Sequence, residues 1–406
     1  MPGRNDTTTK STFLKILMVT RETRSDQRYG LGRSLMPLVE ELCHRGIQTD
    51  YLCQADLGQR SLLWQHRLQR LFSVLFEITN TQTDFPVLFQ VLLERINMGR
   101  LAAKLAATQQ YTHVHCHDPF IAAGLRFFLR FHLRRRIAWG VTEHGFGCYA
   151  QAIHEDGVHM GQRTMRVMRR WEARTLLDAS WVIAPTHCCL KQIADDLEIS
   201  PLPPNWHDVV HARPLLNRYS RKEARNQLGW NDMAMYVLSV GRIAPVKQFP
   251  LLIEAFAQLK HTKDLQLVIL GEGDFHSLQQ QAQQLGLTRE IQFAITTDVG
   301  LYLSAADLYV SASASESFGL ANLEALAAGT PAVCTAVGGV LEVLGDGAFM
   351  VTPDVKSLAE GMQRMLNDST LRESIAKKGK TRADAWPDII EITNRYEIIY
   401  RKTATN

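Results

Sequence analysis

The sequence lacks any long hydrophobic run, since no stretch of about 18 uninterrupted apolar residues occurs in the chain. A helix that spans a membrane is therefore not expected. Residues 1–11 are polar and lack the apolar segment of a signal peptide. The sequence predicts a protein that stays in the cytoplasm. Its 46% hydrophobic and 21% charged residues are ordinary for a globular protein, and 406 residues suffice for two domains.

The sequence also lacks C-x-x-C pairs, tandem repeats and a strong charge excess. The seven cysteines are odd in number, which indicates free thiols in a reducing compartment and no disulfide framework. The net charge is only +4, with +6 in residues 1–213 and −2 in the remainder. Without a larger basic excess or a base-reading motif, a nucleic-acid partner is not expected.

Short apolar runs rich in β-formers alternate with helical segments, in two series. The first series comprises residues 13–20, 49–54, 112–117, 137–142 and 181–186, and the second 235–241, 265–271, 291–295, 307–312, 331–336 and 349–352. Such alternation is typical of parallel sheets covered by helices on both faces. The sequence therefore predicts an α/β protein with two Rossmann-like domains.

The boundary between the two series is predicted in residues 200–217, which carry four prolines and no clean period. We expect one domain over 1–212 and a second over 213–385. Residues 386–406 begin with Trp-Pro and then keep apolar positions at helical spacing. They predict a final helix that packs back on the first domain.

Two acids lie eight residues apart in the stretch Ser-Glu-Ser-Phe-Gly-Leu-Ala-Asn-Leu-Glu. The pattern predicts Glu316 in a turn after a buried strand, and Glu324 inside a helix that ends at Gly329. The free amides at a helix start favour an anion, while the carboxylates suit hydroxyl groups. Together they indicate a sugar nucleotide. The alternative is a solvated pair of acids beside a core helix.

Cations and glycines follow other predicted strands. Arg242 and Lys247 come after the strand at 235–241, and such strand ends are where open α/β sheets bind ligands. These two side chains could neutralise a diphosphate. Gly271 follows the next strand, where its backbone can come close to a ligand. Gly30 and Gly32 open a helix near the N-terminal end and indicate a phosphate or acceptor site.

Six elements together carry a resemblance to a known family. They are Ser-Val-Gly-Arg-Ile-Ala-Pro-Val-Lys, Leu-Gly-Glu-Gly, the Glu-x7-Glu stretch, Gly-Gly-Val-Leu-Glu ending at Glu342, Glu-His-Gly at 143–145, and the Trp-Pro-led last helix. With them, nearly the whole chain resembles glycosyltransferase family 4. This family implies the GT-B fold, in which two Rossmann-like domains face each other across a cleft, and retaining transfer of a sugar.

The resemblance also implies roles for particular residues. Arg242 and Lys247 would grip the donor diphosphate, with Gly271 close by. The amides of Phe318, Gly319 and Leu320 would meet the distal phosphate and the sugar. Glu316 would contact the donor sugar, and Glu324 the ribose hydroxyls. His144 would lie against the donor sugar, and Gly30 and Gly32 would approach the phosphate. Residues 1–212 would bind the acceptor, and 213–385 the nucleotide sugar.

The expected reaction is hexosyl transfer from a nucleotide sugar to a glycan, a glycolipid or a small hydroxylated acceptor, in polysaccharide or glycolipid biosynthesis. A UDP-sugar is expected before a GDP-sugar. No Asp-x-Asp occurs, so fixed cations and amides, without a metal or other cofactor, are the simpler means to stabilise the departing diphosphate. Two alternatives are an epimerase acting on sugar nucleotides, and a catalytically silent donor-binding subunit of a glycosyltransferase complex.

Two further patterns have competing interpretations. His113, His115 and His117 alternate on one face of a strand as zinc ligands could, but zinc is not expected, because a structural site would need a fourth ligand. Residues 59–76 and 125–136 are basic, aromatic and free of acids. They predict either peripheral contact with an anionic membrane on its cytoplasmic face or ordinary domain helices with exposed arginines.

Overall fold

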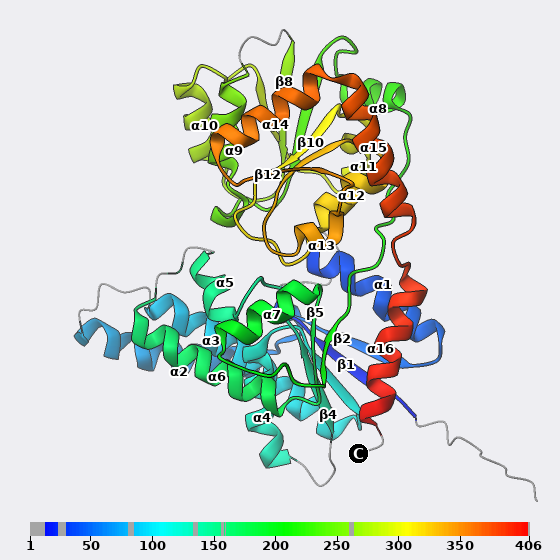
Figure 1. Cartoon of the computed structure of the whole chain (residues 1–406). Coiled ribbons are helices and arrows are strands. Elements are labelled where there is room, and N and C mark those ends of the chain that lie inside the picture. The colour runs from blue at the N-terminus through cyan, green and yellow to red at the C-terminus, as the bar shows by residue number, and fades with distance from the viewer. Residues whose placement is uncertain are drawn as a thin grey trace, which may run out of the picture. The chain divides into compact units, whose positions relative to one another are not determined.

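A computed structural model describes residues 13–22, 30–79, 85–132, 137–155, 158, 160–259 and 264–404. Twelve strands in these residues form two parallel six-stranded sheets, in the orders β2-β1-β3-β4-β5-β6 and β12-β11-β10-β7-β8-β9 (Figure 1). The predicted α/β class with two parallel sheets is therefore confirmed. The strands are β1 Lys15–Val19, β2 Gln48–Leu52, β3 His113–Cys116, β4 Ala138–Thr142, β5 Trp181–Ala184, β6 Trp206–Asp208, β7 Met235–Val240, β8 Leu265–Leu270, β9 Ile291–Ala294, β10 Leu308–Ser311, β11 Ala332–Thr335 and β12 Phe349–Val351.

Helices connect these strands, as right-handed crossovers between parallel strands require. The α-helices are α1 Gly30–His44, α2 Gln59–Thr79, α3 Phe85–Thr108, α4 Pro119–His132, α5 Tyr149–Glu155, α6 Gln162–Asp178, α7 His187–Asp196, α8 Arg221–Leu228, α9 Phe249–Ala257, α10 His276–Gln284, α11 Val299–Ala305, α12 Leu320–Ala328, α13 Val340–Leu344, α14 Val355–Asn367, α15 Ser369–Asp384 and α16 Ile389–Thr403. Short 3-10 turns occur at Gln54–Asp56 (η1) and Pro245–Lys247 (η2).

The chain divides into two compact units. Unit 1 runs to Glu143 and adds Trp171–Val182 and the residues from Thr393 on. Unit 2 comprises His144–Arg170 and Ile183–Ile392. The domain limits predicted from the sequence, 1–212, 213–385 and 386–406, stay predictions.

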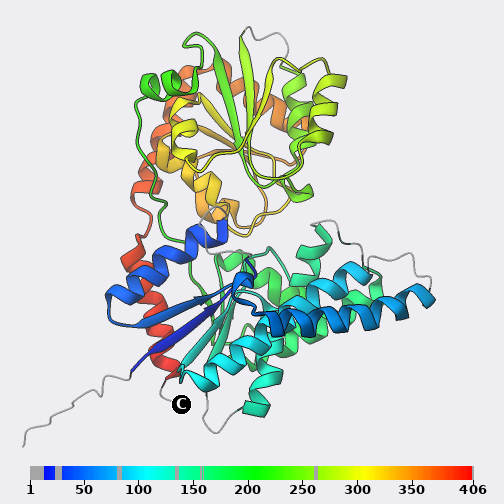
Figure 2. The ribbon, with the colours of Figure 1, turned by 180° about the vertical axis from the view of Figure 1, so that it is seen from behind.

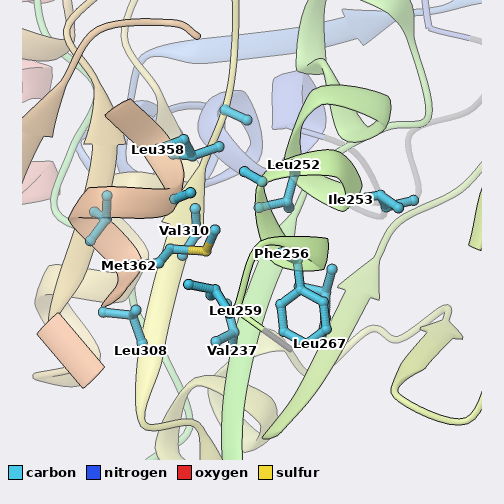
Figure 3. Packing of buried hydrophobic residues seen from close by; sticks show 14 of the residues in the cluster. Val237, Leu252, Ile253, Phe256, Leu259, Leu267, Leu308, Val310, Leu358 and Met362 are labelled. Carbon is cyan, nitrogen blue, oxygen red and sulfur yellow. The ribbon is translucent and has the colours of Figure 1, made fainter. Parts of the chain in front are cut away.

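The β7–β12 sheet has a separate hydrophobic core on each face. On one face, Val237 and Val310 of the sheet pack against Leu252 and Phe256 of α9 and Met362 of α14, as Figure 3 shows. On the other face, Tyr236, Leu238, Tyr309 and Cys334 contact residues of α11, α12 and α13. Burial on both faces explains why these strands read as continuous apolar runs in the sequence. The two covered faces leave the strand ends as the places for polar side chains.

In unit 1, β3 carries the three alternating histidines. The ring nitrogens of His113 lie 2.8 Å from Thr112 Oγ1 and 3.0 Å from the Tyr400 carbonyl oxygen. Those of His115 lie 2.7 Å from the Tyr400 hydroxyl and 2.7 Å from Thr142 Oγ1. Burial lowers the pKa of His113 to about 4 and that of His115 to about 3. Both are therefore neutral hydrogen-bonding residues at neutral pH, and within the described residues no cluster suited to a metal ion occurs.

The C-terminal part of α16 belongs to unit 1. Besides the bonds from Tyr400 to β3, Arg45 at the end of α1 donates to Asn394 at 2.5 Å and pairs with Glu397 at 3.2 Å. Figure 2 shows α16, in red, beside α1, in blue. The apolar periodicity that predicted this helix corresponds to its buried residues Ile392, Tyr396 and Ile399.

The predicted strands agree with the observed ones within two residues at each end, and one strand was missed. That strand, β6, has three residues and lies within the proline-rich segment 200–217. A three-residue strand is too short to show a period, so no pattern predicted it.

Candidate functional site

The site lies where the order of the β7–β12 sheet changes direction. From β7 the chain builds β8 and β9 on one side, and then returns to place β10, β11 and β12 on the other side. The crossovers that follow β7 and β10 therefore run to opposite sides of the sheet from the carboxyl ends of these two neighbouring strands. Ligands of open α/β sheets bind at such a point. The predicted residues Arg242, Lys247 and Glu316 all come from the loops that follow these two strands.

The loops after β7 and β10 are joined directly. Lys247 Nζ forms an ion pair with Glu316 Oε1, and their side chains are 24% and 12% exposed. Ser313 Oγ donates to the same carboxylate oxygen at 2.8 Å. The amide of Ala314 donates to the Val246 carbonyl oxygen at 2.8 Å. The structure therefore brings Lys247 and Glu316 together and fixes the carboxylate with a second donor.

The loops after β7 and β8 also touch, and their hydrogen bonds join backbone to backbone. The Gly241 amide donates to the Leu270 carbonyl at 2.9 Å, and the Ile243 amide to the Glu272 carbonyl at 2.8 Å. A Cβ on Gly271 would overlap the carbonyl oxygen of Gly241. Position 271 therefore requires glycine for close packing of the two loops. Arg242 lies between these contacts and is exposed.

The turn after β10 leads into α12 through Gly319, which has a left-handed φ of 81°. A Cβ there would come within 2.6 Å of Asn322 Nδ2, so both the backbone and the packing select glycine. The Gly319 carbonyl accepts from the amides of Asn322 and Leu323 at 3.0 and 3.2 Å. Leu320 begins the helix, and Phe318 is 2% exposed behind the turn. The first-turn amides thus lie at the start of α12, as the sequence predicted.

Both acids of the Glu-x7-Glu stretch are largely buried. Glu324 in α12 is only 4% exposed, and Glu316 is held by Lys247 and Ser313. The alternative of two solvated acids beside a core helix is therefore wrong. Burial raises the pKa of Tyr309 well above its usual range, and the neighbouring Cys334 and the carboxylates of Glu316 and Glu324 raise it further. Tyr309 accordingly stays a phenol and donates to Asn322 Oδ1 at 2.8 Å.

His144 follows β4, and within unit 2 its backbone is bound to the turn after β10. Ser317 Oγ donates to the His144 carbonyl oxygen at 2.6 Å. The ring of His144 is stacked with that of His211, with centroids 6.0 Å apart and planes 7° apart. The structure therefore brings a third predicted residue next to the loop that contains Glu316.

The glycines near the N-terminal end belong to unit 1 and lie inside α1. The Gly32 amide donates to Glu22 Oε1 at 2.7 Å, and the other oxygen of that carboxylate accepts from the Tyr51 hydroxyl. An amide at the start of α1 is thus already hydrogen-bonded to the carboxylate of Glu22. For Gly30 and Gly32 the predicted contact with a phosphate remains a prediction.

Sequence reasoning missed several side chains that shape the site. Ser313 and Ser317 bind Glu316 and the His144 backbone, and Asn322 buttresses Gly319. His211 stacks between His144 and Phe318. Serines flank Glu316 in the sequence, but only the fold shows what their hydroxyls contact. His211 lies in the proline-rich segment, where no periodicity indicated a position.

The arrangement combines three binding chemistries. Arg242 and Lys247 supply positive charge, and the start of α12 supplies amides, so an anion would be stabilised by both. Glu316 and Glu324 offer carboxylates, which accept hydrogen bonds from hydroxyl groups. A molecule that carries a diphosphate and hydroxylated rings matches this set of groups.

Solved structures share this architecture over the whole chain. A sucrose-phosphate synthase from Thermosynechococcus elongatus superposes with a TM-score of 0.75 over 96% of this chain and 98% of that one, at 20% identity. HepE from Anabaena, in complex with UDP-glucose, superposes with a TM-score of 0.67 over 97% and 100% of the two chains, also at 20% identity. The fold is therefore that of the GT-B glycosyltransferases.

Sequence comparison identifies the family. The model "Glycosyltransferase Family 4" matches residues 29–205, and the model "Glycosyl transferases group 1" matches residues 220–382. The chain belongs to the family 4 glycosyltransferases and is thus a sugar-transferring enzyme by family. The resemblance seen in the motifs is confirmed.

Curated relatives have varied specificities. An uncharacterized glycosyltransferase of Methanocaldococcus jannaschii is 28% identical over 72% of this chain and 77% of its own length. An alpha-monoglucosyldiacylglycerol synthase of Streptococcus pneumoniae is 32% identical over 44% of each chain. The second alignment spans less than half of that relative. Among the described residues, no helix has the length and apolar character to cross a membrane.

Proposed function

We propose that the protein is a retaining, metal-independent hexosyltransferase that moves a sugar from a nucleotide sugar to a hydroxylated acceptor. The observation that carries the proposal is the Lys247–Glu316 ion pair in the loops at the carboxyl ends of β7 and β10. There, a cation and a carboxylate meet in the segment that leads into α12. A UDP-sugar is the favoured donor and a GDP-sugar the second choice. HepE, a structural neighbour, binds UDP-glucose, which supports this preference.

Each residue of the site has a role in this proposal. Arg242 and Lys247 hold the diphosphate, and the Gly241–Gly271 contact lets the backbone approach it. The amides from Phe318 to Leu320 meet the distal phosphate. Glu316 and Glu324 accept hydrogen bonds from sugar and ribose hydroxyls respectively. His144 lies against the transferred sugar, and Gly30 and Gly32 approach the phosphate, where Gly32 would exchange its bond to Glu22.

The chemical contribution of the site is electrostatic. As the bond to the sugar breaks, the departing nucleoside diphosphate gains negative charge. Lys247, held by Glu316, and the helix amides are in place before the reaction, so they stabilise that charge with little reorganisation, and Arg242 adds a second positive charge. The ion pair with Glu316 holds Lys247 in place when no donor is bound. When a diphosphate binds, the three N–H groups of the Lys247 ammonium can donate hydrogen bonds to both the phosphate and the carboxylate.

A screen of nucleotide sugars tests the proposal. Binding of a donor to the folded protein raises its melting temperature, by an amount that grows with the ratio of ligand concentration to Kd. We expect UDP-sugars to give the largest shift, followed by transfer to an acceptor with release of UDP, detected by mass analysis. The anomeric configuration of the product, read by NMR, tests retention. A screen in which no nucleotide sugar shifts the transition would refute the donor assignment.

The acceptor in this proposal is a glycan, a glycolipid or a small hydroxylated molecule, bound in part by unit 1. The pneumococcal relative is named as the synthase of a glucosylated diacylglycerol, which supports a lipid-linked acceptor. In that case the protein works in the cytoplasm and touches the membrane surface with two helices. On α2, Leu63 and Leu71 are 56% and 61% exposed, and on α4, Phe127 and Phe131 are 52% and 70% exposed.

Exposed arginines accompany these apolar side chains. Arg60, Arg67 and Arg70 lie at helical spacing with Leu63 on α2, and Arg130 lies between the exposed phenylalanines of α4. This mixture suits an anionic lipid surface. Arg134 to Arg136, which extended the basic segment in the sequence, lie outside the described residues.

Direct assays distinguish two alternative functions from the proposed transferase activity. An epimerase would isomerise its donor without an acceptor, so incubation of donor alone would yield the isomer. A silent donor-binding subunit would bind UDP yet release none from any donor across a broad acceptor panel. The intact pairing of Lys247 and Glu316 argues against the silent subunit.

A further inference from the structure

One hydrogen bond, from Ser317, joins His144 to the turn after β10, and Ser317 is itself held by a second bond. Ser317 follows Glu316 directly, and its hydroxyl donates to the His144 carbonyl at 2.6 Å. Its own carbonyl accepts from Thr186 Oγ1 at 2.9 Å. Next to it, the Glu316 carbonyl accepts from the Gly339 amide at 2.8 Å. The segment around His144 is thus bonded to the backbone that carries Glu316.

The ring of His144 has a separate support. His211 stacks on it, with planes only 7° apart, and also meets Phe318 in an edge-on contact at 4.9 Å and 86°. The His211 carbonyl accepts from Trp386 Nε1 at 2.9 Å. Phe318 contacts the Trp386 ring at a centroid distance of 5.8 Å. His211 is therefore fixed from behind while its face supports His144.

We propose that Ser317 and His211 are positioning residues for His144, the first through its backbone and the second through its ring. The inference rests on the proposed function and deepens it. Displacing a contact group by about 1 Å can cost about 100-fold in rate, although the group itself is still present. A histidine bonded through its carbonyl and stacked through its ring has little freedom to move from its place beside Glu316.

Substitution of Ser317 gives the first test. With the favoured donor, Ser317→Ala should lower kcat about tenfold while the affinity for UDP changes less than twofold. Ser317→Thr keeps the hydroxyl and should restore most of the rate. The matched control is Ser304→Ala on α11, which removes a similar hydroxyl-to-carbonyl bond of 2.7 Å and should leave kcat unchanged. Equal effects of Ser317→Ala and Ser304→Ala would overturn the proposal.

Coupling to His144 gives the second test. If Ser317 acts through His144, then Ser317→Ala should have almost no further effect on kcat in a His144→Ala background. The same holds for His211→Ala, while His211→Phe retains a flat ring and should preserve more of the rate than His211→Ala. Losses that add fully in the double variants would show that neither residue works through His144.

A third measurement does not depend on activity. In protein labelled at the histidine rings, the NMR signals of His144, assigned by loss in His144→Ala, should shift in Ser317→Ala and in His211→Phe. They should stay in place in Ser304→Ala. Unchanged His144 signals in both site variants would contradict the proposal even if the protein transferred no sugar. Failure of the proposed function alone would leave this shift intact.

Discussion

At the scale of single residues, charge has two distinct uses in this protein. Arg242 is exposed in the loop after β7, where we propose that it binds a phosphate. Arg225 is fully buried, where it holds the fold together. The two guanidinium groups therefore lead to opposite expectations when each is replaced.

Replacing Arg242 with Ala should weaken donor binding and turnover. A charge-assisted bond to a phosphate contributes about 2 kcal/mol, or about 30-fold in kcat/KM. Steady-state kinetics with a UDP-sugar measure this loss. Arg289→Ala is the matched control, because Arg289 is equally exposed but precedes β9 at the opposite end of the sheet. Near-normal kinetics for Arg242→Ala would remove this residue from the diphosphate site.

Replacing Arg225 with Met should destabilise the fold without a direct effect on the site. Its guanidinium donates to the carbonyls of Ala305, Asn231 and Ala234 at 3.0 Å each, and pairs with Asp307 at 2.7 Å. Removing one partner of a buried ion pair costs about 3–5 kcal/mol. Chemical denaturation measures the loss.

The control for Arg225 is a neighbour that shares its partner. Arg221 also pairs with Asp307, at 2.6 Å, but its side chain is 50% exposed. Because water screens such a pair, Arg221→Met should cost about 1 kcal/mol or less. Similar losses in the two variants would mean that burial is not what makes Arg225 important.

At the scale of elements, the start of α12 depends on the left-handed Gly319. Gly319→Ala should cost about 1 kcal/mol in backbone strain and also press against Asn322. Since the turn carries the amides predicted to meet the phosphate, UDP affinity should fall with it. Gly286→Ala is the control, because its φ is +67° and a Cβ there would meet nothing within 4 Å. The Gly286→Ala variant should lose a similar amount of stability. Its affinity for UDP, measured by isothermal calorimetry, should stay unchanged.

The attachment of α16 to β3 should respond to acid. The pKa values of His113 and His115 are about 4 and about 3 in the folded state, because burial disfavours the charged ring. An unfolded histidine has a pKa of about 6.5, so below that pH the unfolded chain binds protons that the folded chain does not. The stability is fully present above about pH 6.5 and falls as the pH drops toward 4.

The magnitude follows from the size of the shift. The free energy of unfolding should be lower at pH 5 than at pH 7.5, by about 2 kcal/mol for each of these two histidines. Denaturant unfolding at the two pH values measures the difference. His113→Gln or His115→Gln should reduce this difference in stability between the two pH values, whereas His276→Gln, at an exposed position, should not. An unaltered pH dependence in the two buried variants would show that other groups cause the acid effect.

At the scale of the whole molecule, the charge is uneven, with the basic excess confined to residues 1–213. If α2 and α4 face a lipid surface, the protein should sediment with vesicles that contain anionic lipid at low salt and be released at high salt. Leu63→Glu and Phe131→Glu together should abolish this binding. The control Leu215→Glu changes an exposed leucine of unit 2, which is 87% exposed, and should have no effect. Wild-type protein that stays in the supernatant would refute the membrane contact.

The sequence allowed much of this architecture to be predicted, since each strand and the α12 helix depend on local patterns. The period of Leu320 and Leu323 and the left-handed Gly329 at the helix end are set within ten residues of chain. The family motifs then indicated Lys247 and Glu316, which the fold brings together. Their ion pair itself joins residues 69 positions apart.

Contacts made by generic side chains could not be predicted. Ser317 binds a carbonyl 173 positions away, and Arg225 bonds both to Asn231 and to the segment that contains Ala305 and Asp307. A serine or an arginine carries no local signal for such a partner, because the partner is decided by the packing of whole elements. The strand β6 was missed for a related reason, since three residues pair with the sheet only through tertiary contacts.

The meeting of Gly241 and Gly271 has a consequence for how donor preference can evolve. Backbone hydrogen bonds and the close approach at Gly271 set the separation of these two loops, and any side chain at position 271 would push them apart. If the diphosphate binds above these loops as proposed, the same backbone would serve any nucleotide sugar alike. Discrimination among bases and sugars would then have to come from the surrounding side chains, which can be exchanged without moving the two loops.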